Sequence, residues 1–213
     1  NEIEAGYSPQ YIRNMLQLNN GEIEGKITLS EIGQLAGVFE TDWSWAPLFA
    51  DFDNDGYKDL FIGNGIPHDV TNMDISELWM KTLKDNPGIQ FSVLYKLLKS
   101  EMDKIGNIKK PNVMFHNTEG LVFENKTNEW GLEKPLYSTG SAFSDLDNDG
   151  DLDLILNNIN DQASVFENRL INKDSVNRKN HYISIILKGD SLNKGGIGAK
   201  ITLYTGEKMQ FYE

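Results

Sequence analysis

Two stretches of the chain carry the same acidic pattern. Residues 49–60 read FADFDNDGYKDL, and residues 143–154 read FSDLDNDGDLDL. Counted from the first Asp of each stretch, acidic residues occupy positions 1, 3, 5 and 9, and glycine occupies position 6. Apolar residues precede and follow each acidic segment. The pattern therefore predicts a tight loop between two β-strands in each stretch, and the strands after the loops are expected to be buried on both faces.

The spacing of the acids predicts a metal-binding loop. Alternate residues of a tight loop point inward, so positions 1, 3, 5 and 9 bring four carboxylates to one centre, and position 7 adds a backbone carbonyl. All these ligands are hard oxygens, which suit Ca²⁺ and suit zinc or copper poorly. We expect two Ca²⁺ ions. The expected ligands are Asp51, Asp53, Asp55, Tyr57 and Asp59 for the first ion, and Asp145, Asp147, Asp149, Asp151 and Asp153 for the second.

The residues after the acids distinguish these loops from an EF-hand. An EF-hand has a bidentate Glu at position 12 and helices on both sides. Position 12 is Ile62 in the first loop and Leu156 in the second, and both lie in strand-like runs. The alternative of an ordinary acidic turn leaves unexplained why four carboxylates gather within nine residues, where they repel one another.

The acidic loops belong to a longer internal repeat. Residues 14–21 are echoed by residues 112–120, and residues 31–38 by residues 127–132. Each copy spans roughly 50 residues, the size of one propeller blade. The first copy is expected within residues 1–66 and the second within residues 112–171.

The remaining segments have different patterns. Residues 67–111 show apolar positions at helical spacing on both sides of Pro87-Gly88, which predicts an inserted α-helical hairpin. We interpret the polar residues 172–180 as a linker and domain boundary. The run HYISIIL at residues 181–187 predicts a new β segment that continues through residues 195–204.

Composition excludes several classes of protein. The chain has no cysteine, which rules out disulfide scaffolds and Cys-ligated metal sites. Its 32 acidic and 20 basic residues give a net charge of −12, so nucleic acid is not an expected partner. No apolar run is long enough to cross a bilayer.

The three histidines show no metal-ligand spacing, and no catalytic triad stands out. His68, His116 and His181 are interpreted as surface or packing residues.

The two acidic stretches resemble the FG-GAP/VCBS repeat of integrin-α-like β-propellers. The segment 180–213, with NKGGIGAKITL at residues 193–203, resembles the start of an ASPIC/UnbV domain of proteins similar to cartilage acidic protein. The stretch GNGIPHDVTNMD at residues 63–74 resembles versions in surface proteins of Bacteroidota-like bacteria. The resemblance implies a mainly β fold of FG-GAP/VCBS β-propeller blades. The propeller is incomplete in these residues, with the helical hairpin inserted and a C-terminal β segment following.

The resemblance further implies an extracellular or cell-surface protein, at the bacterial outer membrane, without enzymatic activity. Three functions are open at this point. The first is a calcium-binding module that binds a protein or glycan at the cell surface. The second is an accessory or catalytic part of a calcium-dependent carbohydrate-active enzyme. The third is a structural subunit of an outer-membrane complex.

Overall fold

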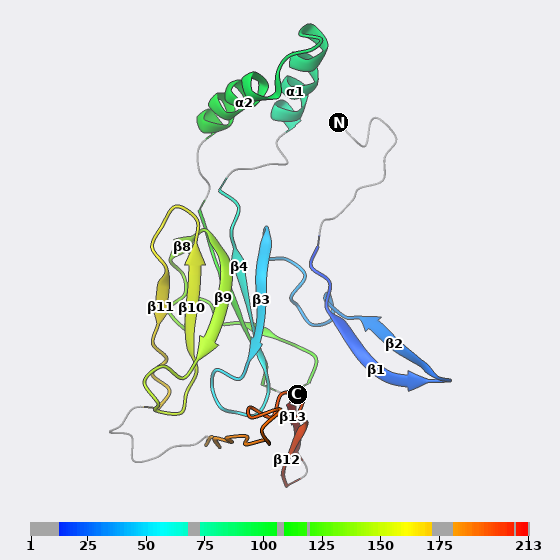
Figure 1. Ribbon diagram of the computed structural model, residues 1–213, viewed down its shortest axis with the longest axis vertical. Helices are drawn as coiled ribbons and strands as arrows, with labels where there is room; N and C mark the ends of the chain where they lie inside the picture. The colour runs from blue at the N-terminus through cyan, green and yellow to red at the C-terminus, as the bar shows by residue number, and fades with distance from the viewer. Residues whose placement is uncertain are drawn as a thin grey trace.

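The computed structural model describes residues 13–67, 73–105, 109–118, 120–171, 181–206 and 208–212. Over these residues the fold is mainly β, with several small antiparallel sheets and two helices (Figure 1). The predicted β class is therefore confirmed. None of the sheets in the described residues closes on itself, and the propeller stays a prediction.

The largest sheet is an antiparallel meander of four strands in the order β3-β4-β6-β7. Strand β4 is buried at every position, as predicted for the apolar run after the first loop. The sheet takes two strands from the first sequence copy and two from the second. Its strands are β3 (Ser44–Ala50), β4 (Asp59–Asn64), β6 (Val113–His116) and β7 (Glu124–Asn125).

A second sheet of three strands has the order β11-β10-β9 and begins in the same way as the first. Phe49 pairs with Leu60 between β3 and β4. Phe143, at the corresponding position of the second copy, pairs with Leu154 between β9 and β10. The two strand pairs therefore share one register. The strands of this sheet are β9 (Ser138–Ser144), β10 (Asp153–Asn158) and β11 (Ser164–Phe166).

A turn further along each copy is also duplicated. The Val38 amide donates to the carbonyl five residues earlier at 3.0 Å, and the Leu132 amide does the same at 2.9 Å. Gly37 and Gly131, which precede these residues, have φ angles of 77° and 73°. This left-handed conformation is one that glycine adopts without steric cost. Corresponding glycines therefore make the same turn in both copies.

An asparagine–serine hydrogen bond recurs at the start of both strand pairs. The Ser44 hydroxyl donates to Asn14 Oδ1 at 2.7 Å. In the second copy, Asn112 Nδ2 donates to Ser138 Oγ at 2.9 Å, and both residues are buried. Asn14 lies just before β1 (Gln17–Ile23) and Asn112 just before β6, and each bonds to a serine at the start of the next sheet, in β3 or β9.

The two larger sheets lie side by side, and their contact depends on glycine. Strands β3 and β9 are neighbours, and Ser141 Oγ donates to the carbonyl of Ala46 at 2.9 Å. A Cβ added to Gly65 would lie 2.6 Å from the carbonyl oxygen of Ser138. Only glycine permits this close approach of the two backbones.

Two apolar clusters hold the sheets together. One cluster lies around β4 and β6 on the side of the first turn, and its buried members are Ile32, Ala36, Val38, Leu60, Ile62 and Phe115. The other lies between the two larger sheets, and its buried members are Ala50, Phe52, Phe61, Met114, Leu132, Leu136, Leu154 and Leu156.

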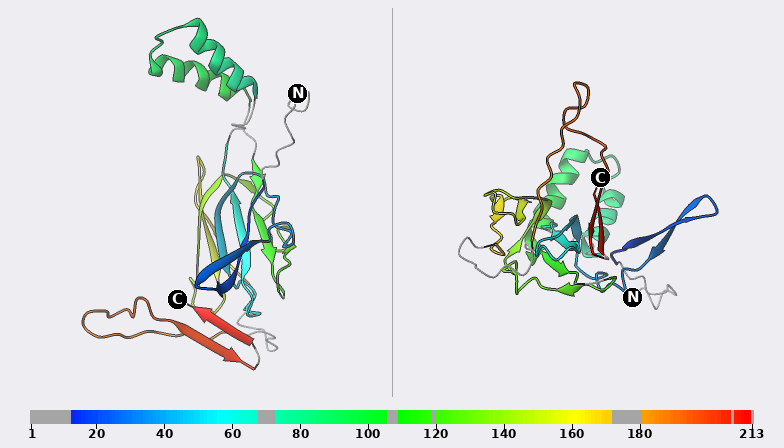
Figure 2. Two further views of the ribbon diagram at one scale, coloured as in Figure 1. Left: turned by 90° about the vertical axis from the view of Figure 1, so that its right-hand side faces the viewer. Right: turned by 90° about the horizontal axis from the view of Figure 1, so that it is seen from below.

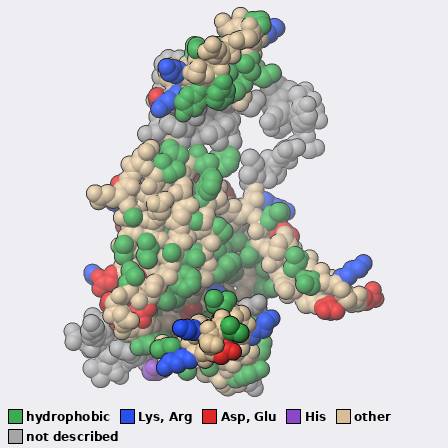
Figure 3. Space-filling view, viewed as in Figure 1, with side chains coloured by type: hydrophobic (Ala, Val, Ile, Leu, Met, Phe, Trp, Pro, Cys, Tyr) green, Lys and Arg blue, Asp and Glu red, His purple; other side chains and the backbone are tan. Residues whose placement is uncertain are grey.

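The two predicted helices are present as α1 (Met73–Asp85) and α2 (Phe91–Ile105). They pack against each other at one end of the sheets, with Leu94 and Leu98 buried (Figure 1). Hydrophobic side chains also gather on the surface of this hairpin (Figure 3). Met80 and Phe91 are among the exposed hydrophobic residues of the two helices. Neither helix has the length and apolar character needed to cross a membrane, and the described residues include no other helix.

Three short strand pairs complete the described residues. A hairpin of β1 and β2 projects from the first turn, and β5 pairs with β8. At the end of the sheets opposite the helices, β12 and β13 form a separate hairpin (Figures 1 and 2). Their bounds are β1 (Gln17–Ile23), β2 (Lys26–Glu31), β5 (Lys110–Pro111), β8 (Pro135–Leu136), β12 (Ile201–Thr205) and β13 (Lys208–Tyr212).

One strand prediction is wrong. Residues 181–187 read as a strand, but residues 181–190 form no regular secondary structure. No described strand lies beside them to complete a hydrogen-bonded ladder, and Ile183 and Ile186 are 62% and 82% exposed. An apolar alternating run forms a strand only when a partner satisfies its backbone groups. The predicted linker at residues 172–180 lies outside the described residues.

Candidate metal centres in two acidic loops

Each acidic loop connects the first strand of a sheet to the second. The first loop runs from β3 to β4, and the second from β9 to β10. Asn54 and Asn148 have φ angles of 56° and 60°, and Gly56 and Gly150 have φ angles of 93° and 98°. Asparagine and glycine are the residues that adopt this left-handed conformation most readily. The two loops therefore follow the same backbone path.

The carboxylate at position 1 organises each loop from within. Asp51 accepts hydrogen bonds from the amides of Asp55 and Gly56 at 3.1 and 2.9 Å. Asp145 accepts from the corresponding amides of the second loop, both at 3.1 Å. These bonds fold the loop around its first residue, so that the carboxylates at positions 1, 3 and 5 converge.

The carboxylate at position 9 joins the loop to the third strand. Asp59 is fully buried and accepts from the amides of Phe52 and Asn117, both at 3.0 Å. Asp153 has the same role in the second loop, where it accepts from Leu146 and Asn168, both at 2.9 Å.

Potential ligand atoms of three residues lie within 4.8 Å of one another in each loop. The first group is Asp51, Asp53 and Asp55, and the second is Asp145, Asp147 and Asp149. Asp53 also belongs to a further group with Asp59 and His116. The structure thus brings together positions 1, 3 and 5 of both loops, and in the first loop it places position 9 close to position 3.

The two residues predicted to ligate through their carbonyls occupy equivalent places. The Tyr57 amide donates to Asp55 Oδ1 at 2.8 Å, and the Asp151 amide donates to Asp149 Oδ1 at 3.1 Å. Asp151 is 1% exposed, and its Oδ2 accepts from the Ile171 amide at 2.8 Å. Its Oδ1 has no hydrogen-bond partner among the described residues.

Three of these carboxyls have raised pKa values. Burial raises the pKa of Asp51 to about 6, and the neighbouring charges of Asp55 and Asp53 add to this effect. Burial raises the pKa of Asp59 to about 7, although two backbone amides and His116 partly oppose the shift. Burial likewise raises the pKa of Asp151 to about 6. A bound cation would favour the ionised form of all three groups.

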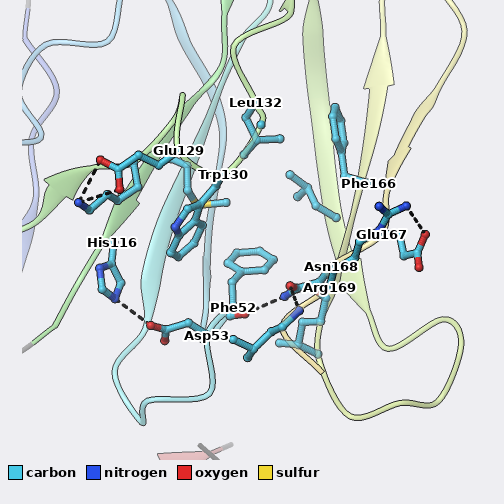
Figure 4. Close-up of a pocket in the computed structure, with 16 residues that line it drawn as sticks. Phe52, Asp53, His116, Glu129, Trp130, Leu132, Phe166, Glu167, Asn168 and Arg169 are labelled. Carbon is cyan, nitrogen blue, oxygen red and sulfur yellow. Dashed lines mark hydrogen bonds and ion pairs between the residues drawn. The ribbon is translucent and has the colours of Figure 1, made fainter. Parts of the chain in front are cut away.

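His116 is a site residue that the sequence analysis missed. The sequence indicates a surface or packing histidine, but its Nε2 lies 2.9 Å from Asp53 Oδ2 (Figure 4). The same nitrogen lies 3.9 Å from Asp55 Oδ2. Its ring also lies 5.4 Å from the ring of Trp130. Metal-ligand spacing gave no signal here, because the histidine reaches the loop from β6.

Asn117 and Asn168 were missed as well, and a short sequence motif connects them. The runs FHN at residues 115–117 and FEN at residues 166–168 end on these asparagines. In each run, the backbone N–H of the asparagine donates a hydrogen bond to the carboxylate at position 9. Strand β11 therefore corresponds to β6. The similarity of these two runs is the sequence signal that could have identified this correspondence.

The two loops are in direct contact. Asn54 Nδ2 in the first loop donates to the carbonyl of Gly150 in the second at 3.0 Å. Asn168 Nδ2 donates to the carbonyl of Phe52 at 2.7 Å, which links the end of β11 to the first loop. Hydrogen bonds therefore join the two loops directly.

The C-terminal residues cover both loops. Gln210 Nε2 donates to the carbonyl of Gly56 at 3.2 Å. Tyr182 lies so close to Gly150 that an added Cβ would be 1.8 Å from its Cε1 atom. Burial, together with the charge of Asp51, raises the pKa of Tyr212.

Comparison with protein-family models and with curated proteins finds no match for the chain. The geometry of the two loops therefore carries the functional argument.

Proposed function

We propose that the two acidic loops each bind one Ca²⁺ ion, and that the ions stabilise a non-catalytic β module of an exported, cell-surface protein. The observation that carries this proposal is that both loops have the same geometry. The backbone is left-handed at corresponding residues of the two loops, and the carboxylates at positions 1, 3 and 5 converge in both. The converging carboxylates repel one another, and a bound cation would offset that repulsion in both loops.

The chemistry of the loops fits calcium. Two carboxylates about 4 Å apart repel by roughly 4 kcal/mol at an effective dielectric of 20. Three carboxylates within 4.8 Å of one another increase this repulsion further. A divalent cation placed among them makes the net electrostatic interaction attractive. Ca²⁺ accepts six to eight oxygen ligands in flexible geometry, which suits carboxylates supplemented by the carbonyls of Tyr57 and Asp151. When bound, the ion would offset two of the negative charges of the loop, while Asp59 and Asp153 fasten the loop to the third strand.

The role in binding at the cell surface rests on the resemblance to FG-GAP/VCBS repeats and to ASPIC/UnbV domains. Such a module presents loops and sheet edges to a protein or a glycan, and calcium holds them in place without disulfides, which the chain lacks. An outer-membrane complex is one setting for such a partner. The acidic residues of the loops act as ligands in this proposal, and none acts as an acid or base catalyst.

Calcium-dependent thermal stability tests the proposal. Millimolar Ca²⁺ is expected to raise the melting temperature of the chain, and Asp53→Ala combined with Asp147→Ala is expected to abolish that rise. The matched control is Asp42→Ala combined with Asp161→Ala, which removes two acids from surface ion pairs with lysines. The control variant should keep the full rise. A melting temperature that does not respond to calcium in the unmodified chain would refute the proposal.

A further inference from the structure

A cavity of about 630 Å³ opens between the two larger sheets, with Trp130 and Phe166 on opposite sides (Figure 4). Its apolar wall comes from the second turn and from strands β6, β10 and β11. The residues of this wall that have counterparts in the first copy are Met114, Trp130, Leu132, Leu154 and Phe166.

In the first copy the corresponding space is filled by Phe123. The corresponding residues there are Leu16, Ala36, Val38, Leu60 and Phe115, and Phe123 packs against the apolar cluster that they form. The Phe123 amide also donates to the carbonyl of Ala36 at 3.0 Å. The cavity therefore marks the place that an aromatic side chain occupies one repeat earlier.

Strand β7 delivers Phe123 to its place. Phe123 immediately precedes β7, which pairs with β6 so that Phe115 faces Asn125 and His116 faces Glu124. Just beyond β7, the Lys126 amide donates to the carbonyl of Met114 at 2.9 Å. The outer edge of β6 thus fixes the register that directs Phe123 into the apolar cluster.

Strand β11 corresponds to β6 but has no outer partner among the described strands. The Asn168 amide points toward β10, where it reaches Asp153 at 2.9 Å. Backbone directions alternate along a strand, so Val165 and Glu167 direct their amides and carbonyls to the other edge. Val165 is 62% exposed and corresponds to Met114. In the first sheet, the Met114 carbonyl accepts the hydrogen bond from Lys126, just beyond β7.

We propose that the edge of β11 binds an extended segment of a partner polypeptide as a fourth strand, with an aromatic side chain of that segment in the cavity. Main-chain hydrogen bonds to Val165 and Glu167 supply affinity, and the cavity supplies specificity. The residue after the aromatic one faces Glu167, as Glu124 faces His116 in the first sheet. A basic residue at that position is therefore preferred, because like charges placed opposite each other destabilise a strand pair.

The charged groups at the rim favour a polypeptide over a glycan. Asp53 pairs with His116, Lys126 with Glu129, and Arg169 with Glu167, at 2.9, 3.0 and 3.4 Å. These groups already engage one another, and the wall behind them is apolar. A sugar needs several polar partners around its hydroxyls, whereas an aromatic side chain fills an apolar space.

The chain supplies its own probe. A fluorescein-labelled peptide with the sequence of residues 120–128, GLVFENKTN, carries Phe123 and β7. In the peptide, Glu124→Lys is introduced to face Glu167. We expect saturable binding by fluorescence anisotropy. The unmodified peptide and a Phe123→Ala version of the Lys peptide are each expected to bind at least tenfold more weakly.

Two variants of the chain test the site itself. Val165→Pro removes the outward amide but no hydrogen bond to β10, because the neighbouring residues of β11 make those bonds. Proline is tolerated on edge strands. Val165→Thr keeps the amide and serves as the control. The proposal requires that binding is lost in Val165→Pro and retained in Val165→Thr, with equal melting temperatures. It is overturned if no peptide binds, if binding survives Val165→Pro, or if the cavity instead binds a saccharide. Self-association that depends on Val165, without peptide binding, would assign the edge to a second copy and overturn the proposal as well.

Discussion

Asn168 connects three backbone segments with one side chain. Its Nδ2 donates to the carbonyls of Phe52 and Leu152 at 2.7 and 3.3 Å, and its Oδ1 accepts from the Leu170 amide at 3.1 Å. Buried donors and acceptors that lose a partner cost about 1–3 kcal/mol. The residue thus contributes to stability as well as to the geometry of the loops.

We therefore expect Asn168→Ala to lower the free energy of unfolding by about 1–3 kcal/mol, as measured by urea denaturation. Asn157→Ala is the control, because that side chain is exposed and makes one long hydrogen bond of 3.4 Å. The control should change stability by less than about 0.5 kcal/mol. Equal effects of the two substitutions would contradict the role assigned to Asn168.

The raised pKa of Asp59 predicts the pH dependence of the calcium-free chain. In the folded chain this pKa is about 7, whereas the ordinary value is 3.8. Between these values the folded state binds the proton and the unfolded state does not, so stability falls as pH rises from about 4 to about 7.

The melting temperature of the calcium-stripped chain should accordingly fall between about pH 4 and about pH 7, and Asp59→Asn should flatten that fall. With saturating calcium the fall should be smaller, because the cation favours the ionised carboxyls. Scanning calorimetry at a series of pH values provides the measurement. A flat or rising melting temperature in the stripped chain would contradict the burial of a carboxyl that favours its protonated form.

At the scale of elements, Tyr182 packs against the second loop. Alanine at Gly150 would meet the ring of Tyr182 and would also adopt a left-handed φ of 98°. Gly131 has a φ of 73° with nothing within 4 Å of an added Cβ, so it isolates the backbone effect. That backbone effect costs about 1–2 kcal/mol.

Gly150→Ala should therefore destabilise the chain by about 1–3 kcal/mol more than Gly131→Ala, the cost of overpacking. Adding Tyr182→Ala to Gly150→Ala should recover part of the difference. Thermal denaturation of the three variants in the absence of calcium separates this contact from metal binding. If Gly150→Ala and Gly131→Ala are equally destabilising, Tyr182 does not pack against the second loop.

The elements also show what the sequence could predict. Strand β4 and the acidic loops are predictable because a short continuous apolar run and the spacing of the acids are local patterns. Residues 181–187 were wrongly assigned because a strand also needs a partner, which a local pattern does not report. His116 and Asn168 escaped notice because they reach the loops from other strands. The propeller and the calcium ions stay predictions.

At the scale of the whole molecule, contact between the loops predicts cooperative calcium binding. The hydrogen bond from Asn54 to the Gly150 carbonyl makes the conformation of each loop depend on that of the other. The first ion to bind would order this contact, so that the second binds to a loop already in place. Isothermal titration should give a Hill coefficient above 1 for the unmodified chain.

Asn54→Gly keeps the left-handed backbone and removes the bond, so it should bring the Hill coefficient to about 1. Asn148→Gly makes the same change in the other loop and is the control, because no loop-to-loop bond from its side chain is seen in the described residues. Two independent sites in the unmodified chain would show that the contact carries no coupling.

The recurring asparagine–serine bond has a consequence for how such a chain changes in length. Ser44 and Ser138 begin corresponding strands and bond to corresponding asparagines. If the codons for residues 44–137 were lost by unequal exchange, Trp43 would lead directly into Ser138. The serine that Asn14 requires would arrive in its proper place. Strands β3 to β8 pair only among themselves in the described residues, so their joint loss would leave no described strand unpaired at the junction.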